Sequence, residues 1–246
     1  MNSRIRIQFI CFCLLIMQPC QFSNSSGKEN VRASVLKGTW YAGSQETLTK
    51  QVDDLLAQVP TPNSNPYQIR ALIAPHAGYT WSGPCAAYSY KPLQGTSYQR
   101  VILLAPSHYS RFQGGSIADV DAYETPLGQV PLDREICDRL QNTKLVQHHP
   151  DAHAQEHSIE IQLPFLQRTL GSFKLVPILI GELKPEDCIG LADILRPLLD
   201  SDTLLVMSSD FTHQGPRFDY VPFKDHVKEK IQSLDFAAVN HILNLD

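Results

Sequence analysis

Hydrophobic residues in this chain gather into four short runs, each of which predicts a buried β-strand. The runs are five to seven residues long and consist mostly of aliphatic side chains without polar alternation. Such continuous runs are typical of parallel strands that are covered on both faces. The four runs are Arg70 to Ala74, Arg100 to Ala105, Lys174 to Ile180 and Thr203 to Met207.

Four other segments place apolar side chains at helical spacing. The first follows Ser44, a common helix N-cap, and the second ends before Gly171. Their apolar positions are Leu48, Val52, Leu55 and Val59; Ile159, Leu163, Leu166 and Leu170; Ile189, Ala192, Leu195 and Leu199; and Val227, Ile231, Leu234, Ala238, Ile242 and Leu245. Strands alternating with helices predict an α/β fold, with a mostly parallel sheet flanked by helices.

The first thirty residues follow a different pattern. Arg4 and Arg6 precede the apolar run Ile7 to Met17, and a polar stretch follows it. This order is typical of a signal peptide, and the run is too short to span a bilayer as a helix. A membrane anchor and a wrongly assigned start codon are the alternatives. We therefore expect a leader or a disordered segment at 1–30 and one domain at 31–246, exported only if the leader is a working signal peptide.

Composition narrows the range of partners and compartments. The chain has 246 residues, 43% of them apolar, and a formal charge of −4, so no basic surface predicts nucleic acid as a partner. Three of the six cysteines lie in the leader, and the other three, Cys85, Cys137 and Cys188, lack the spacing of a zinc or redox motif. Free thiols favour the cytoplasm, so the two indications of compartment disagree.

Histidines follow three of the four predicted strands within a few residues. They are His76, His108 and His213, and Asp210 precedes the last of them. Because the carboxyl ends of parallel strands meet at one edge of a sheet, these side chains should converge. Neutral imidazole is a good ligand for iron, copper or zinc, and a carboxylate can coordinate the metal or orient a ligand. The sequence therefore predicts a mononuclear metal site.

The alternative is that each histidine is an ordinary loop residue. The residues around two of them argue against it, because Pro75 and Pro106 end their strands and Gly78 allows the backbone to pass close to a ligand. Trp40, flanked by Gly38 and Gly43, either lines a pocket or packs beneath its loop.

A fourth candidate is the segment Glu156-His157-Ser158-Ile159-Glu160, which we expect to open a helix. His157 and Glu160 would share one helix face, and we take His157 as a functional residue. The two glutamates have either a chemical role or only a capping role at the helix N-terminus. We expect the nearby His148, His149 and His153 to be solvated loop residues.

Several ordered motifs together resemble the MEMO family, named for a mediator of ErbB2-driven cell motility and called AmmeMemoRadiSam system protein B in prokaryotes. The resemblance runs from about Val35 to the C-terminus. The motifs are Gly38-Thr39-Trp40-Tyr41, Ala74-Pro75-His76-Ala77-Gly78-Tyr79, Pro106-Ser107-His108, Tyr123-Glu124-Thr125-Pro126-Leu127, Glu156-His157-Ser158-Ile159-Glu160 with Leu163-Pro164, and Ser208-Ser209-Asp210-Phe211-Thr212-His213.

The resemblance implies a fold similar to class III extradiol dioxygenases, which hold non-haem iron at the carboxyl edge of such a sheet. It implies His76 and His108 as metal ligands, His213 beside the metal in the place of the dioxygenase acid/base histidine, and Trp40 as a pocket residue. We take His213, Asp210 and His157 as the candidate catalytic residues and Tyr79 as a second pocket residue. It also implies iron or copper as cofactor, a cytoplasmic location, and, from the animal member, a phosphotyrosine-containing peptide as ligand.

One part of the family pattern is missing. The family's third ligand is a cysteine in a motif like Cys-Gly-Arg, in a C-terminal stretch that this sequence lacks, so we expect a C-terminally incomplete domain. Two histidines, with Asp210, would then supply the donors. The first functional hypothesis is an iron- or copper-dependent oxidoreductase. The second is a non-catalytic module that binds a peptide or small anionic ligand in the same pocket, and a zinc hydrolase ranks last.

Overall fold

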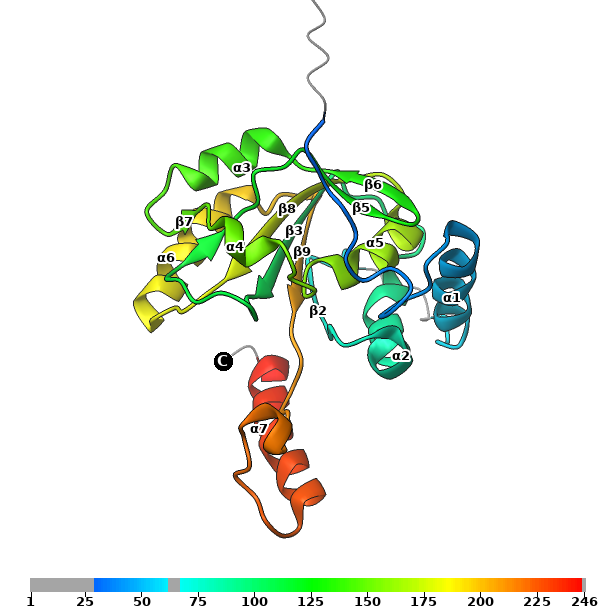
Figure 1. The fold of residues 1–246 in the computed structure, drawn as a ribbon, viewed down its shortest axis with the longest axis vertical. Helices are drawn as coiled ribbons and strands as arrows, with labels where there is room; N and C mark the ends of the chain where they lie inside the picture. The colour runs from blue at the N-terminus through cyan, green and yellow to red at the C-terminus, as the bar shows by residue number, and fades with distance from the viewer. Residues whose placement is uncertain (1–28, 62–66, 245–246) are drawn as a thin grey trace, which may run out of the picture.

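The computed structural model describes residues 29–61 and 67–244, and a six-stranded sheet forms its centre (Figure 1). The strand order is β2-β9-β3-β8-β4-β7. The strands are β2 (Ala71–Ala74), β9 (Thr203–Ser208), β3 (Arg100–Pro106), β8 (Lys174–Ile180), β4 (Gly115–Ser116) and β7 (Val146–Gln147). The four predicted strands are confirmed to within one residue at each end, and they form the centre and one edge of this sheet.

The sheet is parallel only in part. β2, β9, β3 and β8 are mutually parallel, whereas β4 runs antiparallel to β8, and β7 is parallel to β4. The sequence missed β4 and β7 because a two-residue strand is too short to show a periodic pattern. The carboxyl ends of β2, β9 and β3 lie side by side, which brings the loops after these strands to one edge of the sheet.

Helices cover both faces of the sheet. On one side α1 (Gln45–Ala57), α2 (Tyr79–Tyr90) and α5 (Leu163–Leu170) pack together, and α3 (Arg134–Gln141), the single turn α4 (Pro150–His153) and α6 (Pro185–Leu195) lie toward the other side (Figure 1). The α/β fold class is confirmed. Ser44 caps α1 as expected, since its side chain accepts a hydrogen bond from the Thr47 backbone N–H.

The predicted stripe of α6 was wrong at its first two positions. Ile189 is 66% exposed and Ala192 is exposed as well, and the helix instead buries Leu191 and Leu195. The reason is that the apolar residues of this helix fit more than one buried face at helical spacing. Only the packing of α6 on the sheet selects the face that is buried.

A second, three-stranded sheet fixes the start of the described chain. It has the order β1-β5-β6, formed by β1 (Val31–Arg32), β5 (Ala122–Thr125) and β6 (Gly128–Pro131). Val31 pairs in parallel with Ala122, while β5 and β6 form an antiparallel hairpin. This pairing draws the segment that carries Trp40 across the body of the domain.

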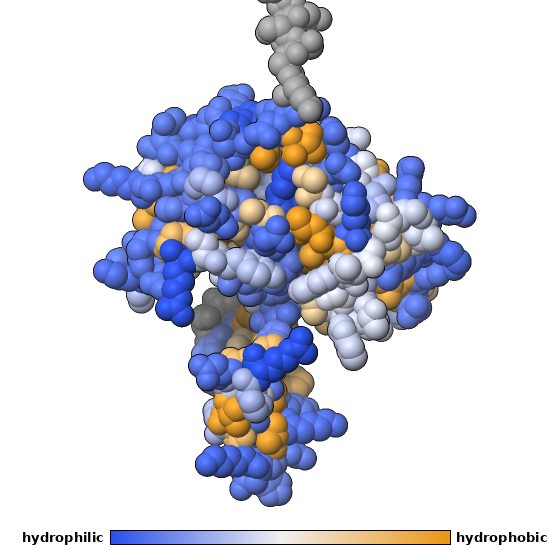
Figure 2. Space-filling model, in the orientation of Figure 1, coloured by the Kyte–Doolittle hydropathy of each residue, from blue (hydrophilic) through white to orange (hydrophobic). Residues whose placement is uncertain are grey.

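The last helix, α7 (Val227–Asn244), lies in a lobe that extends from the end of β9 (Figure 1). The expected C-terminal helix is confirmed, but it buries none of its side chains, and apolar residues such as Phe236 and Leu243 are exposed on it. The apolar colouring of this lobe is visible in Figure 2.

The described ranges contain no helix that combines the length and the apolar character needed to cross a bilayer. The predicted leader falls almost entirely on residues 1–28, which lie outside the described residues.

Candidate metal centre

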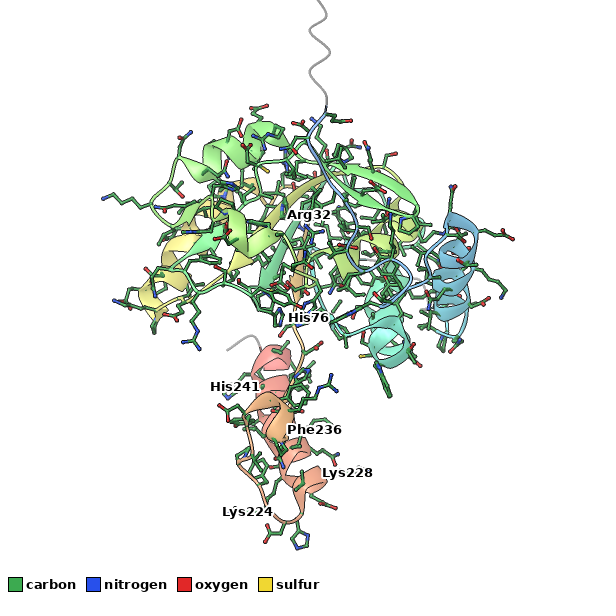
Figure 3. The ribbon with its side chains drawn as sticks, viewed as in Figure 1. Arg32, His76, Lys224, Lys228, Phe236 and His241 are labelled. Carbon is green, nitrogen blue, oxygen red and sulfur yellow. The ribbon has the colours of Figure 1, made fainter. Side chains whose placement is uncertain are left out.

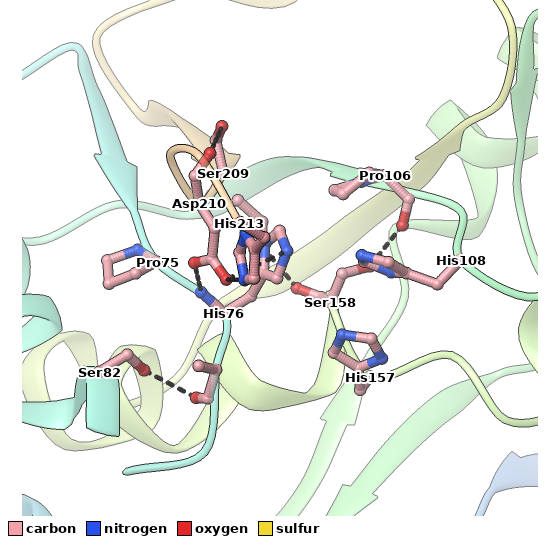
Figure 4. Close-up of polar contacts among 12 residues, drawn as sticks. Pro75, His76, Ser82, Pro106, His108, His157, Ser158, Ser209, Asp210 and His213 are labelled. Carbon is pink, nitrogen blue, oxygen red and sulfur yellow. Dashed lines mark hydrogen bonds and ion pairs between the residues drawn. The ribbon is translucent and has the colours of Figure 1, made fainter. Parts of the chain in front are cut away.

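Three histidines from distant parts of the chain converge at the carboxyl edge of the sheet (Figure 4). His76 follows β2, His108 follows β3, and His157 lies in the loop that leads into α5. One ring nitrogen from each lies within 4.8 Å of one ring nitrogen of each of the others. The ring centroids are 5.2 Å apart for His76 and His108, and 4.2 Å for His108 and His157. This spacing allows three imidazoles to coordinate one ion.

His76 is held firmly on its buried side. Its backbone N–H donates to Oδ1 of Asp210 at 2.8 Å, and its ring Nδ1 lies 3.0 Å from the hydroxyl of Ser208, at the end of β9. Burial, only partly offset by the Asp210 carboxylate, lowers the pKa of the His76 imidazole. The ring is therefore neutral near pH 7, the form that coordinates metals. Figure 3 shows His76 at the edge of the body from which the chain continues into α7.

Glu156 fixes the orientation of His108. One carboxylate oxygen, Oε1, lies 2.9 Å from the ring Nδ1 of His108, and the other accepts the His108 backbone N–H at 2.7 Å. Burial alone would raise the pKa of Glu156, but hydrogen bonds from the His108 side chain and backbone and from the Ser158 backbone lower it to about 2. The ionised carboxylate accepts a hydrogen bond from the protonated Nδ1 of His108. The unprotonated Nε2 of the ring is then free to coordinate a metal.

His157 is the third member of the cluster. It is 8% exposed, and its ring packs against Trp40 with 4.6 Å between the ring centroids. Burial, with the nearby His108 adding to it, lowers its pKa to about 4. Its buried Nδ1 makes no hydrogen bond within the described part of the protein, although Oε1 of Glu156 lies 3.3 Å away. We expected His157 on a helix; the structure places it before the helix, within the three-histidine cluster.

Asp210 and His213 lie beside the cluster rather than within it. Oδ2 of Asp210 is 3.8 Å from Nε2 of His76 and 3.4 Å from Nε2 of His213. Nδ1 of His213 is 2.9 Å from the Phe211 carbonyl, which can only accept, so this nitrogen carries a proton. Nε2 of His213 is thus the atom that can take up a proton, with the Asp210 carboxylate next to it.

A pocket of about 440 Å³ opens next to these residues. It is lined by Thr39, Trp40, Ala77, Gly78, Thr80, Trp81, His213, Arg217 and Phe218. Trp40 therefore lines a pocket, whereas Tyr79 does not line this one. The Tyr79 ring is buried against Tyr41 and Phe165, and its hydroxyl donates to the Ile161 carbonyl at 2.8 Å. Tyr79 is a core residue, because the first turn of α2 directs its side chain inward.

The expectation that Glu156 and Glu160 begin a helix was wrong. The α-helix starts at Leu163, and Glu160 begins a short 3-10 helix in front of it. Glu160 is fully buried and accepts hydrogen bonds from the Arg32 guanidinium, two side-chain hydroxyls and two backbone N–H groups of the segment 34–41. Burial alone would raise its pKa, but these hydrogen bonds lower it below the ordinary value. Glu160 thus anchors the segment that carries Trp40.

No sequence pattern indicated a role for Gln162 or Arg217. Gln162 is buried behind His76, where its side-chain amide donates to the Ser208 hydroxyl and to the Pro75 carbonyl. Arg217 is the one cationic side chain among the residues that line the pocket beside Trp40. The only sequence indication for Arg217 is its position four residues after His213, and a single arginine in a loop is not specific enough to predict a role.

His153 is buried, contrary to the expectation of a solvated loop residue. It closes the short helix α4, its Nε2 lies 2.8 Å from the Ser116 hydroxyl, and its other ring nitrogen has no hydrogen-bond partner among the described residues. Burial lowers its pKa to about 3. The loop containing His148 and His149 therefore packs onto the body through this side chain.

The buried His153 predicts a pH-dependent stability. Its folded-state pKa of about 3 lies below the ordinary 6.5, so the unfolded chain binds more protons between these values. Protonation of His153 should therefore not change the free energy of unfolding above pH 6.5. Below pH 6.5 it should lower this free energy by up to about 1.4 kcal/mol per pH unit. Urea denaturation of metal-free protein between pH 7 and pH 5 measures this slope.

The His153→Gln variant should show a shallower slope than the parent chain. The exposed His226, replaced by asparagine, is the matched control for the loss of a histidine at the surface. Equal slopes for the parent and His153→Gln would show that His153 is protonated in the folded protein.

Comparisons with known proteins place the chain among relatives from animals and archaea. It matches the family described as Memo-like protein over residues 32–246. It is 34% identical over 230 residues to the protein memo-1 homolog of Caenorhabditis elegans, which covers 89% of this chain and 64% of that protein. Protein MEMO1 of Homo sapiens is 34% identical over 218 residues, covering 85% of this chain and 72% of that protein. A MEMO1 family protein of Methanopyrus kandleri is 34% identical over 225 residues, or 86% of this chain and 79% of the relative. The chain thus spans less than two thirds of the length of the nematode protein.

Proposed function

Since this chain belongs to the Memo-like protein family, we propose that it binds an iron or copper ion through His76, His108 and His157 and uses it for oxidation chemistry. The convergence of three ring nitrogens within 4.8 Å at the carboxyl edge of the sheet carries this proposal. The family fold is similar to that of class III extradiol dioxygenases, in which this edge holds non-haem iron.

The donor set fits such an ion. Three imidazoles suit iron, copper or zinc better than the harder magnesium or calcium, which prefer oxygen ligands. Ser208 and Glu156 hold the Nδ1 atoms of His76 and His108, as outer-shell partners of metal-bound histidines commonly do. His157 supplies the third donor more readily than Asp210, because the nearest Asp210 oxygen lies beside His76 and His213 and outside the three-nitrogen cluster.

The surrounding residues supply the other parts of a redox site. The bound ion would activate dioxygen or exchange single electrons with a ligand in the adjacent pocket. His213 would accept a proton from that ligand at Nε2, and Asp210 would stabilise the resulting imidazolium. Trp40 excludes water from one side of His157 and forms a wall of the pocket.

The pocket also supports a second function, binding without turnover. Arg217 with Trp40, Trp81 and Phe218 gives one cationic group among aromatic surfaces, which suits a peptide or small molecule with an anionic group. In this case the ligand would keep its affinity after the metal is removed.

Metal content and oxygen uptake test the first proposal. Purified residues 29–246, loaded with Fe(II) or Cu(II) and freed of excess ion, should retain about one ion per chain by elemental analysis, as three ligands on a rigid frame predict. The loaded protein should consume dioxygen in the presence of a reductant. The His76→Ala/His108→Ala double variant is the comparison, and His148→Ala, an exposed histidine outside the cluster, is the matched control.

Retention of the ion by the double variant would exclude this site as the metal centre. A folded parent chain that binds neither ion would contradict the metal-dependent function and leave ligand binding in the pocket as the remaining function.

A further inference from the structure

We propose that Ser208 and Gln162 are positioning residues that hold His76 in the tautomer with the proton on Nδ1, so that Nε2 presents its lone pair to the metal site. The inference rests on the proposed metal-binding function for its purpose, but the tautomer itself follows from hydrogen bonds that the metal does not enter. It concerns buried groups on the side of His76 away from the cluster.

The single hydroxyl proton of Ser208 decides the tautomer. The Ser208 hydroxyl donates to the backbone carbonyl of Ser158 at 2.7 Å, and a carbonyl can only accept. It also accepts a hydrogen bond from the Gln162 side-chain amide at 2.9 Å. A hydroxyl has one proton and two lone pairs, so only a lone pair remains for the ring Nδ1 of His76, 3.0 Å away. Nδ1 must therefore be the donor, and in the neutral ring Nε2 is unprotonated.

Gln162 is itself fixed in one orientation. Its NH₂ group donates to the Pro75 carbonyl at 2.9 Å, and its side-chain oxygen accepts the hydroxyl of Tyr90 at 2.8 Å. A flipped amide would place two oxygen acceptors against each other at Pro75, so the donor must face Pro75 and Ser208. Gln162 is almost fully buried and Tyr90 completely so, which makes an unpaired polar group in this network costly.

The network also links the loops that carry the metal donors. Gln162 contacts the loop after β2 through Pro75, and Ser158 donates from its hydroxyl to the Pro106 carbonyl at the end of β3 at 2.8 Å. Ser208 lies at the end of β9, between these two strands. Its position therefore holds His76 in register with the loop that carries His108.

His76 and His108 are oriented by acceptors of different charge. His108 Nδ1 faces the ionised Glu156 carboxylate, whereas His76 Nδ1 faces the neutral Ser208 hydroxyl. A carboxylate acceptor raises the basicity of an imidazole more than a hydroxyl does, so the two ligands differ in electron donation. Ser208 thus selects the tautomer of His76 without adding negative charge next to the metal.

The tautomer can be read directly in the metal-free protein. Chain labelled with ¹⁵N in its histidines, kept at pH 8 with a chelator, gives separate nitrogen resonances for protonated and unprotonated ring nitrogens. The His76 signals are identified by their loss in a His76→Gln variant. We expect a protonated Nδ1 and a bare Nε2 in the parent chain, and a mixture of both tautomers in Ser208→Ala.

Two further variants separate positioning from general structural damage. Ser208→Thr keeps the hydroxyl and should retain the parent tautomer. Ser209→Ala changes the exposed residue directly after β9 and should leave the tautomer unchanged. Copper affinity, measured by competition with a chromophoric chelator, should fall about 10–100-fold in Ser208→Ala and remain near the parent value in Ser208→Thr.

The two proposals fail in different ways. A His76 ring protonated at Nε2 in the parent spectrum would overturn the positioning inference, whatever the metal affinity and even if the alanine variant did not fold. A ring protonated at Nδ1 in a chain that binds no copper or iron would support the inference and contradict the proposed function.

Discussion

Replacing Glu160 with alanine is expected to lower the free energy of unfolding by about 3–5 kcal/mol, the range found when one partner of a buried ion pair is removed. The Glu160 side chain is completely buried, and one of its oxygens lies 2.7 Å from Nη1 of Arg32. Without the carboxylate, the Arg32 guanidinium would remain buried beside unpaired donors from Ser34 and Tyr41. The Arg32 side chain, labelled in Figure 3, is buried, so water cannot readily replace the lost partner.

Urea denaturation followed by circular dichroism measures this loss. The control is Asp53→Ala, which removes an ion pair with Arg168 at the surface, where both partners are well exposed, and should cost no more than about 1 kcal/mol. If Glu160→Ala does not fold, an Arg32→Met/Glu160→Leu double variant should recover part of the stability, because it removes both buried charges. A Glu160→Ala chain as stable as Asp53→Ala would show that this network does not anchor the segment 34–41.

Replacing His157 with alanine is expected to reduce iron or copper affinity by more than the roughly 10–100-fold that loss of an outer-shell partner costs. The prediction follows because His157 would supply one of the three proposed donors, and the remaining two would bind the ion more weakly. Glu156→Gln is the informative comparison, since it keeps all three imidazoles and weakens the acceptor shared by the His108 ring and by the backbone N–H groups of His108, His157 and Ser158. Its loss should fall within that outer-shell range.

Isothermal titration of metal-free protein gives these affinities. His148→Ala is the matched control, because this histidine is exposed and lies outside the cluster. Unchanged affinity in His157→Ala would mean that the third donor comes from elsewhere, and it would return His157 to a role in packing against Trp40.

The anchoring of Trp40 connects these two predictions. Glu160 fixes the segment 34–41, and that segment places the Trp40 ring over His157. Loosening the segment would open the pocket to water beside a metal donor. A Glu160 substitution that removes part of this network but still allows folding should therefore lower metal affinity as well as stability, although Glu160 itself contacts no donor atom.

The sequence by itself determined the four mutually parallel strands, the capped helix that follows Ser44, and two of the three metal-donor candidates. These features are local: an aliphatic run becomes a buried strand wherever a sheet can receive it, and a histidine just after such a strand lies at the carboxyl edge of that sheet. His76 and His108 were found by this rule. The ordered motifs also pointed to the family, which the comparisons confirmed over residues 32–246.

Only the tertiary structure decided the roles of residues whose partners lie far away in the chain. Glu156 and Glu160 have the same side chain four positions apart, yet one orients His108 and the other pairs with Arg32. His153 and Tyr79 are buried by contacts that neither periodicity nor motif contains. The physical reason is that burial, hydrogen-bond partner and ionisation state are properties of the packed environment, and sequence spacing sets that environment only within a single strand or helix.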